Sequence, residues 1–210
     1  MPARDPDTDV LIDRASGGDR SARQQLLVRH RDRLRRMISV RMDRRLAARV
    51  DPSDVVQEVL TDAAQELSDY LARRPLPFYP WLRQLAWDRL VELHRKHVRA
   101  RKRSVTREET GVLDLPDESA VALAARLLDT GSSPSERLLR SELRGRVRDA
   151  LNRLSDRDRE VLVIRHLEGL STKEISAILG ISEAAVKTRH VRALDRLQRL
   201  LRDELGEDYP

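Results

Sequence analysis

The chain has 210 residues, which suits one large domain or two small ones. Lys and Arg total 41 against 35 for Asp and Glu, and the resulting net charge of +6 favours polyanionic partners. The lack of cysteine excludes disulfides, thiolate catalysis and cysteine-based zinc sites. No apolar run approaches the ~20 residues that span a bilayer, and the N-terminus lacks a signal-peptide core, so we expect a cytoplasmic protein without membrane insertion.

The composition favours an all-α fold made of small helical domains. Charged residues make up 36% of the chain and aromatic residues only 3%, and the apolar residues are mostly Leu, Val, Ala and Ile. Glycine is sparse, with 8 residues, which argues against glycine-rich phosphate loops.

The N-terminal half shows helical periodicity. A short helix is expected over Asp9–Ala15, ending at Gly17-Gly18, and Asp19 can cap the next helix. One face of that helix is apolar, with Ala22, Leu26, Leu27, Leu34, Met37 and Ile38. Its other face is dense in arginine, with Arg29, Arg31, Arg33, Arg35 and Arg36.

Two longer helices are expected next. Asp51 can cap a helix with Pro52 at its first position, whose buried stripe comprises Val55, Val56, Val59, Leu60, Ala63, Ala64 and Leu67. Three prolines between Arg73 and Pro80 argue against regular helix there. A long amphipathic helix then runs from Trp81 to about Arg101, with an apolar face of Leu82, Leu85, Ala86, Leu90 and Leu93.

Residues 104–134 change in character and predict a linker, with one short helix at 120–128. The segment 135–205 returns to helical periodicity and precedes a short tail, 206–210. Two serines there, Ser155 and Ser171, stand three residues before an acidic residue, as in a capping box.

Residues 171–189 fit a helix-turn-helix. Ser171 caps the first helix and Ser182 the second, Ser176 is small enough for a close crossing, and Gly180 can take the positive φ of a tight turn. The shared core would hold Ile175, Leu179, Ile181 and Val186, and the second helix would expose Lys187, Thr188, Arg189 and Arg192 to the major groove. The alternative is an ordinary helical hairpin with a solvated basic face.

Aromatic residues gather immediately before a basic run. Phe78, Tyr79, Trp81 and Trp87 precede a series that comprises Arg89, His94, Arg95, Lys96, His97, Arg99, Arg101, Lys102 and Arg103. Rings that stack on bases beside cations that hold the backbone suit single-stranded DNA. The alternatives are a local aromatic core and a solvated helix end. His94 and His97 lie one turn apart, but without a third ligand nearby we expect no metal.

A further helix face is acidic. Asp54, Glu58 and Asp62 are spaced four apart, with Gln57 beside them. Such a face would suit a basic protein surface better than DNA, the alternative being a plain solvated face.

In this order, the motifs resemble the extracytoplasmic-function sigma factors, group 4 of the sigma-70-like family. The run from Asp51 to Glu58 resembles the family's polymerase-binding signature. Trp81 to Arg95 resembles the segment that binds and melts the −10 element, and Leu154 to Leu197 resembles the −35-binding domain, with its Glu-Gly-Leu-Ser lead-in at Glu168. The resemblance covers about 10–103 and 135–205. A helix-turn-helix alone is common to many regulators, whereas the paired signatures are far more specific.

The resemblance implies sigma region 2 over 1–103 and sigma region 4 over 135–205, two small helical domains joined by a flexible linker. The protein would be no enzyme and would need no cofactor. It would bind core RNA polymerase through the β′ clamp and the β flap, and direct promoter recognition, −10 melting and transcription initiation. Promoter DNA is the second partner, and an anti-sigma factor is a candidate third.

The resemblance also assigns residues. Polymerase binding would fall to Asp51, Asp54, Gln57 and Glu58. Binding of −10 DNA would fall to Phe78, Tyr79, Trp81, Arg83, Gln84, Trp87, Asp88, Arg89, His94, Arg95 and Lys96. Binding of −35 DNA would fall to Ser171, Thr172, Lys173, Glu183, Ala184, Lys187, Thr188, Arg189 and Arg192.

Four positions depart from the family pattern. Asp88 replaces a frequent Asn, prolines flank Phe78-Tyr79, His190 replaces an apolar residue and Ser176 replaces the more usual Ala. Two other functions are compatible with parts of the sequence. One is a stand-alone helix-turn-helix regulator whose N-terminal half senses or dimerises. The other is an enzyme acting on nucleic acid, which the lack of a P-loop, an HExxH motif or a deaminase metal set disfavours.

Overall fold

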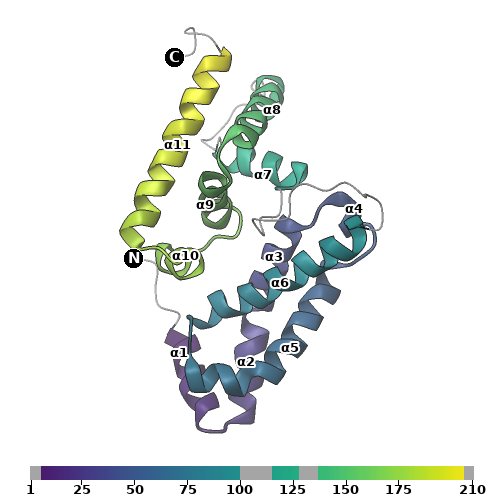
Figure 1. The fold of residues 1–210 in the computed structure, drawn as a ribbon, viewed down its shortest axis with the longest axis vertical. Coiled ribbons are helices and arrows are strands. Elements are labelled where there is room, and N and C mark those ends of the chain that lie inside the picture. Colours follow the sequence, from purple (N-terminus) through teal and green to yellow (C-terminus); the bar gives the residue numbers. More distant parts are fainter. Residues whose placement is uncertain (1–5, 100–114, 128–136, 206–210) are drawn as a thin grey trace. The chain divides into compact units, whose positions relative to one another are not determined.

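The computed structural model describes residues 6–99, 115–127 and 137–205, and within these ranges its regular secondary structure is entirely helical. The chain divides into two compact units, 1–113 and 114–210 (Figure 1). The all-α, two-domain expectation is therefore confirmed. Of the described helices, none is both long and apolar enough to cross a membrane.

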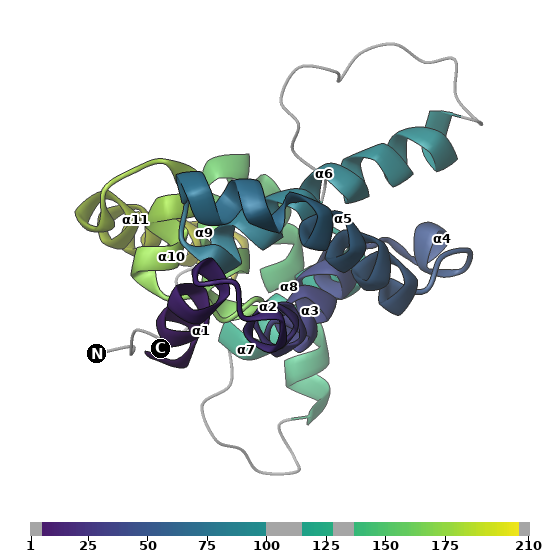
Figure 2. The ribbon, with the colours of Figure 1, turned by 90° about the horizontal axis from the view of Figure 1, so that it is seen from below.

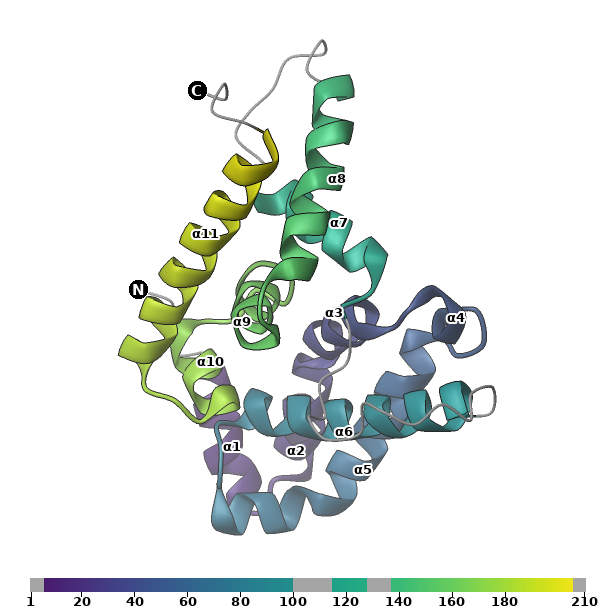
Figure 3. The ribbon, with the colours of Figure 1, turned by 45° about the horizontal axis from the view of Figure 1, so that its top comes forward.

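Unit 1 contains α1 (Pro6–Ser16), α2 (Arg20–Arg29), α3 (Arg31–Arg41), α4 (Arg44–Ala47), α5 (Pro52–Arg73) and α6 (Phe78–Arg99). Helices α3, α5 and α6 pack against one another, and α1 packs on α2 and α5. The short helix α4 lies at the end of the unit farthest from α1 (Figures 2 and 3). The core of the unit is aliphatic, with Leu26, Leu34, Met37, Val55, Val59, Leu82 and Leu90 all almost fully buried.

The expected single helix from Asp19 through Ile38 is in fact two helices, α2 and α3. Asp19 caps α2 as predicted, its carboxylate accepting from the Ala22 amide at 3.0 Å. The break falls at His30, where the backbone leaves helical geometry (φ −96°, ψ 2°). An unbroken helix would turn Leu34 about 80° away from Leu26. The break corrects this drift, so that both side chains are fully buried.

The corner between α5 and α6 corrects another prediction. Asp51 caps α5 as expected, by accepting from the Ser53 amide at 2.6 Å, and α5 ends at Arg73, one residue into the segment predicted to be irregular. However, α6 begins at Phe78 rather than Trp81 and contains Pro80 in its first turn. A proline is tolerated there because first-turn amides have no partner within the helix. Another prediction was wrong as well: Ala64, placed in the buried stripe of α5, is exposed.

Unit 2 contains α7 (Asp117–Leu127), α8 (Arg137–Arg153), α9 (Asp156–His166), α10 (Thr172–Leu179) and α11 (Glu183–Leu205). Helix α11 packs on α8, α9 and α10, and α7 packs on α8 and α9 (Figure 3). The helix expected at 120–128 is thus present as α7 and grouped with unit 2. The other expected linker residues, 104–114 and 128–134, lie outside the described residues, as do the tail 206–210 and the basic residues Arg101, Lys102 and Arg103.

Candidate nucleic-acid and protein interfaces

The helix-turn-helix forms with the predicted local bonds. Ser171 and Glu174 make a full capping box: the Glu174 amide donates to Ser171 Oγ at 3.2 Å, and the Ser171 amide donates to Glu174 Oε2 at 2.9 Å. Gly180 takes the left-handed conformation (φ 63°, ψ 30°) that ends α10. Ser182 Oγ accepts from the Ala185 amide at 3.1 Å and so caps α11. These bonds fix the direction in which α11 leaves the turn.

Ser176 does more than its small size predicts. Its hydroxyl donates to the Ile181 carbonyl at 2.5 Å, while the Ile181 amide donates to the Ser176 carbonyl at 3.2 Å. Both bonds span the turn between α10 and α11, and the first of them requires the serine hydroxyl, which an alanine lacks. The expected core is only partly realised, because Ile175 and Val186 are buried whereas Leu179 and Ile181 stay half-buried.

The face of α11 that was predicted to contact −35 DNA is largely open to solvent. Its exposed members are Glu183, Ala184, Lys187, Thr188 and Arg192. Arg189 is half-buried, as are Ser171 and Thr172 at the start of α10, while Lys173 is exposed. Sequence reasoning missed Val191, which is 64% exposed on the same face, seven residues from Ala184. In the sequence, the only sign of this role is an apolar residue, Val191, that follows Lys187, Thr188 and His190 and precedes Arg192.

His190 has a partner that the sequence did not suggest. Its Nε2 lies 2.9 Å from Nε2 of His166 on α9, and the two rings stack with centroids 5.2 Å apart. Burial, followed by the charges of His190, Arg165 and Arg126, lowers the pKa of His166. Burial and the charge of Arg165 lower the pKa of His190. The contact joins α9 to α11 as a hydrogen bond only while at least one of the two facing nitrogens carries no proton, because one nitrogen must accept what the other donates.

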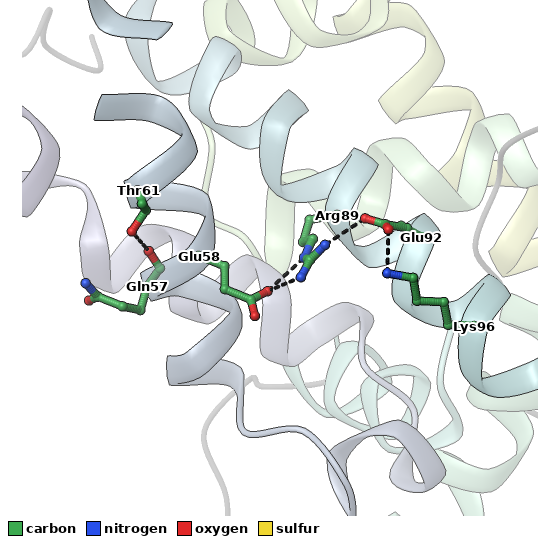
Figure 4. A network of polar contacts seen from close by, with 6 residues as sticks. All are labelled: Gln57, Glu58, Thr61, Arg89, Glu92 and Lys96. Atoms are coloured by element: carbon green, nitrogen blue, oxygen red, sulfur yellow. Dashed lines mark hydrogen bonds and ion pairs between the residues drawn. The ribbon is translucent and has the colours of Figure 1, made fainter. Parts of the chain in front are cut away.

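The acidic face of α5 lies outward as predicted. Asp51, Asp54, Gln57 and Glu58 are all exposed, and the valines that alternate with them are buried against the rest of unit 1. The backbone amide of Ser53 lowers the pKa of the Asp51 carboxyl, because the hydrogen bond stabilises its charged form. Figure 4 shows Gln57 and Glu58 on this face, with the Thr61 hydroxyl donating to the Gln57 carbonyl at 2.8 Å.

Glu58 is joined to α6 by a chain of ion pairs. Arg89 Nε donates to Glu58 Oε2 at 2.7 Å, and Arg89 Nη1 donates to Glu92 Oε2 at 2.7 Å. Lys96 Nζ lies 2.6 Å from Glu92 Oε1 (Figure 4). Two of the cations predicted to hold −10 DNA are therefore paired with carboxylates.

The aromatic cluster is mostly core, which corrects the prediction that these rings stack on bases. Phe78, Tyr79 and Trp81 are only 2%, 3% and 8% exposed. Trp81 stacks on Tyr70 with ring centroids 4.4 Å apart, and Phe78 meets Tyr70 edge-on at 5.3 Å. Burial raises the pKa of Tyr70 to about 12. These three side chains therefore form a local aromatic core, which was the alternative prediction. Arg83, another predicted −10 contact, is only 5% exposed and is buried as well.

The other predicted −10 residues remain accessible. Gln84, Asp88, Arg95 and Lys96 are exposed, and Trp87, Arg89 and His94 are half-buried. The guanidinium carbons of Arg41 and Arg83 lie 5.2 and 5.6 Å from the Trp87 ring centroid, close enough for cation–π contact. The side chain of His97 lies outside the described residues. Within the described ranges, no three potential metal ligands gather.

Comparison with known proteins agrees with this geometry. Residues 144–197 match the family model described as Sigma-70, region 4. A probable RNA polymerase sigma factor, RfaY, of Xanthomonas campestris is 30% identical over 156 residues, 74% of this chain, but the match spans only 34% of that protein. The ECF RNA polymerase sigma-E factor of Haemophilus influenzae is 27% identical, with 90% of this chain and 92% of the relative covered.

The Escherichia coli K12 sigma-E factor is 29% identical, with 90% of this chain and 91% of the relative covered. Among solved structures, CnrH in complex with the cytosolic domain of CnrY superposes with a TM-score of 0.51 at 25% identity, covering 95% of this chain and 99% of that one. Together these findings show that the chain belongs to the extracytoplasmic-function sigma factors. It is a sigma factor of transcription initiation, and a stand-alone regulator is not favoured.

Proposed function

We propose that this sigma factor docks on core RNA polymerase through Asp51, Asp54, Gln57 and Glu58 of the α5 face. The observation that carries the proposal is the exposed acidic face itself, opposite the buried valines of the same helix. A negative surface on a chain of net charge +6 suits a basic protein partner rather than DNA. The β′ clamp would receive this face, and unit 2 would meet the β flap.

For the −35 element, the proposed contacts are those of the helix-turn-helix. Lys173, Lys187 and Arg192 are exposed cations that can meet phosphates, while Thr188 and Arg189 can reach base edges as α11 enters the major groove. Ser171 and Thr172 at the start of α10, with Glu183 and Ala184 at the start of α11, would lie nearest the duplex.

For the −10 element, the burial of Phe78, Tyr79 and Trp81 narrows the proposed set. The accessible candidates are Gln84, Trp87, Asp88, His94, Arg95 and Lys96. Of the four clustered aromatic residues, Trp87 is the one whose ring is partly open to an unstacked base, and the exposed Arg95 offers a cation for the DNA backbone. Each domain would bind weakly alone, and polymerase would hold both at the promoter spacing.

The protein would work in the cytoplasm, with RNA synthesis left to the polymerase. An inhibitory anti-sigma factor remains a candidate partner. The related protein CnrH was solved in complex with the cytosolic domain of another protein, CnrY. By analogy, such a partner would cover the exposed faces of α5 or α11.

The experiment that tests the docking proposal is a core polymerase affinity measurement on Asp54→Arg. Charge reversal at the exposed Asp54 should weaken binding strongly, because it places a cation against a basic surface. The matched control is Glu66→Arg, the same change at an exposed residue three turns along α5. Equal retention of polymerase by Asp54→Arg and wild type would show that this face is not the docking surface.

The −35 assignment is tested with Arg189→Ala, which should weaken binding of −35 duplex and leave polymerase affinity intact. The matched control is Arg199→Ala, because Arg199 lies three turns further along α11 and pairs with Asp195 at 2.8 Å. Unchanged promoter affinity in Arg189→Ala would contradict the recognition-helix assignment.

A further inference from the structure

We propose that Arg89 acts as a positioning residue of the polymerase-docking face, fixing the Glu58 carboxylate, and that it does not contact promoter DNA. This rests on the proposed docking function of α5. Arg89 lies on α6, the helix assigned to −10 DNA, yet its guanidinium reaches across to α5 (Figure 4). The sequence suggested the opposite role, because Arg89 begins the basic run.

All three nitrogens of the Arg89 guanidinium contact carboxylates, which engages three of its five N–H donors. Nε and Nη2 both reach Glu58 Oε2, at 2.7 and 2.5 Å, and Nη1 reaches Glu92 Oε2 at 2.7 Å. The hydrogen bond with Glu58 is the main reason that the pKa of Arg89 is raised, which shows how strongly the pair favours the charged guanidinium. A phosphate would have to compete with these two carboxylates for the same guanidinium.

The charges around Arg89 cancel. Arg89 and Lys96 contribute two positive charges, and Glu58 and Glu92 two negative charges, so the network is neutral as a whole. Arg89 is also the least accessible member, with a side chain 26% exposed against 60% for Lys96. A neutral, partly covered group attracts DNA weakly, whereas Arg95 is exposed and no carboxylate in the described part of the chain pairs with it.

Glu58, in contrast, remains available to a partner. Its side chain is 49% exposed, and both bonds from Arg89 fall on Oε2. Within the described residues, Oε1 has no hydrogen-bond partner and can accept from a basic group of polymerase. Because Arg89 holds the carboxylate in one orientation, less side-chain freedom is lost on docking, which is worth roughly two- to tenfold in affinity.

The test measures core polymerase affinity and promoter opening separately, with full-length Arg89→Gln, Glu58→Gln and the double variant. Arg89→Gln should weaken polymerase binding roughly two- to tenfold. The double variant should bind no worse than Glu58→Gln, because an arginine that acts through Glu58 has nothing left to position. Arg89→Lys should restore only part of the affinity, since a lysine cannot donate through two fixed nitrogens.

The contrast variant is Arg95→Gln, on the exposed side of the same helix, which should impair promoter opening without changing polymerase affinity. If Arg89→Gln behaves like Arg95→Gln, Arg89 is a DNA contact and the proposal is overturned. Additive losses in the double variant would also overturn it, because they would show an effect of Arg89 independent of Glu58. Failure of Asp54→Arg to weaken polymerase binding would instead refute the docking function itself.

Discussion

Replacement of Phe78 decides whether the aromatic cluster is core or a base-binding platform. The side chain is 2% exposed and lies between the rings of His30, Tyr70 and Trp81, at centroid distances of 5.4, 5.3 and 5.6 Å. Phe78→Ala should therefore lower the free energy of unfolding by about 3–5 kcal/mol, the usual cost of emptying a buried phenylalanine site. Such a loss is a large part of the roughly 5–15 kcal/mol that stabilises a typical domain.

The chain offers a selective assay for this loss. Its 2 tryptophans, Trp81 and Trp87, both belong to unit 1, so tryptophan fluorescence during urea unfolding reports on that unit alone. The urea midpoint should fall with an unchanged slope. Gln84→Ala, at an exposed position of the same helix, should change stability by no more than about 0.5 kcal/mol. A Phe78→Ala protein of near wild-type stability that fails to open promoters would refute the core assignment.

Three other predictions concern unit 2. Gly180→Ala should cost about 1–2 kcal/mol in its unfolding, measured by circular dichroism, because φ is +63° while nothing lies within 4 Å of the new Cβ; an unchanged midpoint would contradict this. Burial lowers the pKa of both His166 and His190 below the ordinary 6.5. As pH falls below about 6.5 the unfolded chain therefore takes up protons first, so stability is full above that pH and declines below it. His190→Leu should flatten this decline between pH 7 and 5, and an equally steep decline would exclude the pair as its source. Val191, 64% exposed on the recognition face, should contact a thymine methyl. Replacing −35 thymines by deoxyuridine should weaken binding of the wild type but not of Val191→Ser, and equal sensitivity would contradict the contact.

Local features of unit 2 could be predicted from the sequence because their partners lie within a few residues. The capping box of Ser171 and Glu174 spans three residues, and the left-handed turn needs only Gly180 itself. The short helix α7 was expected within about three residues of its observed bounds. Such features depend only on the backbone geometry and side-chain chemistry of a few neighbouring residues, so the local sequence is enough to predict them.

The long-range pairs could not be predicted. Arg89 meets Glu58 across 31 positions and His190 meets His166 across 24. A cation next to a basic run gives no sign of which carboxylate it will face, because that depends on how α5 and α6 pack. For the same reason, a ring that can stack on a base and a ring that fills a core look alike in the sequence.

By itself, then, the sequence determined most of the longer helices, the caps, the turn of the helix-turn-helix and the outward acidic face of α5, since periodicity and short-range bonds fix all of these. Tertiary structure decided that Phe78, Tyr79 and Trp81 face inward and that the chain breaks at His30 between α2 and α3. It also decided that Arg89 forms an ion pair with Glu58. The physical reason is that burial and ion pairing depend on which surfaces meet when the helices pack, and no short stretch of sequence contains that information.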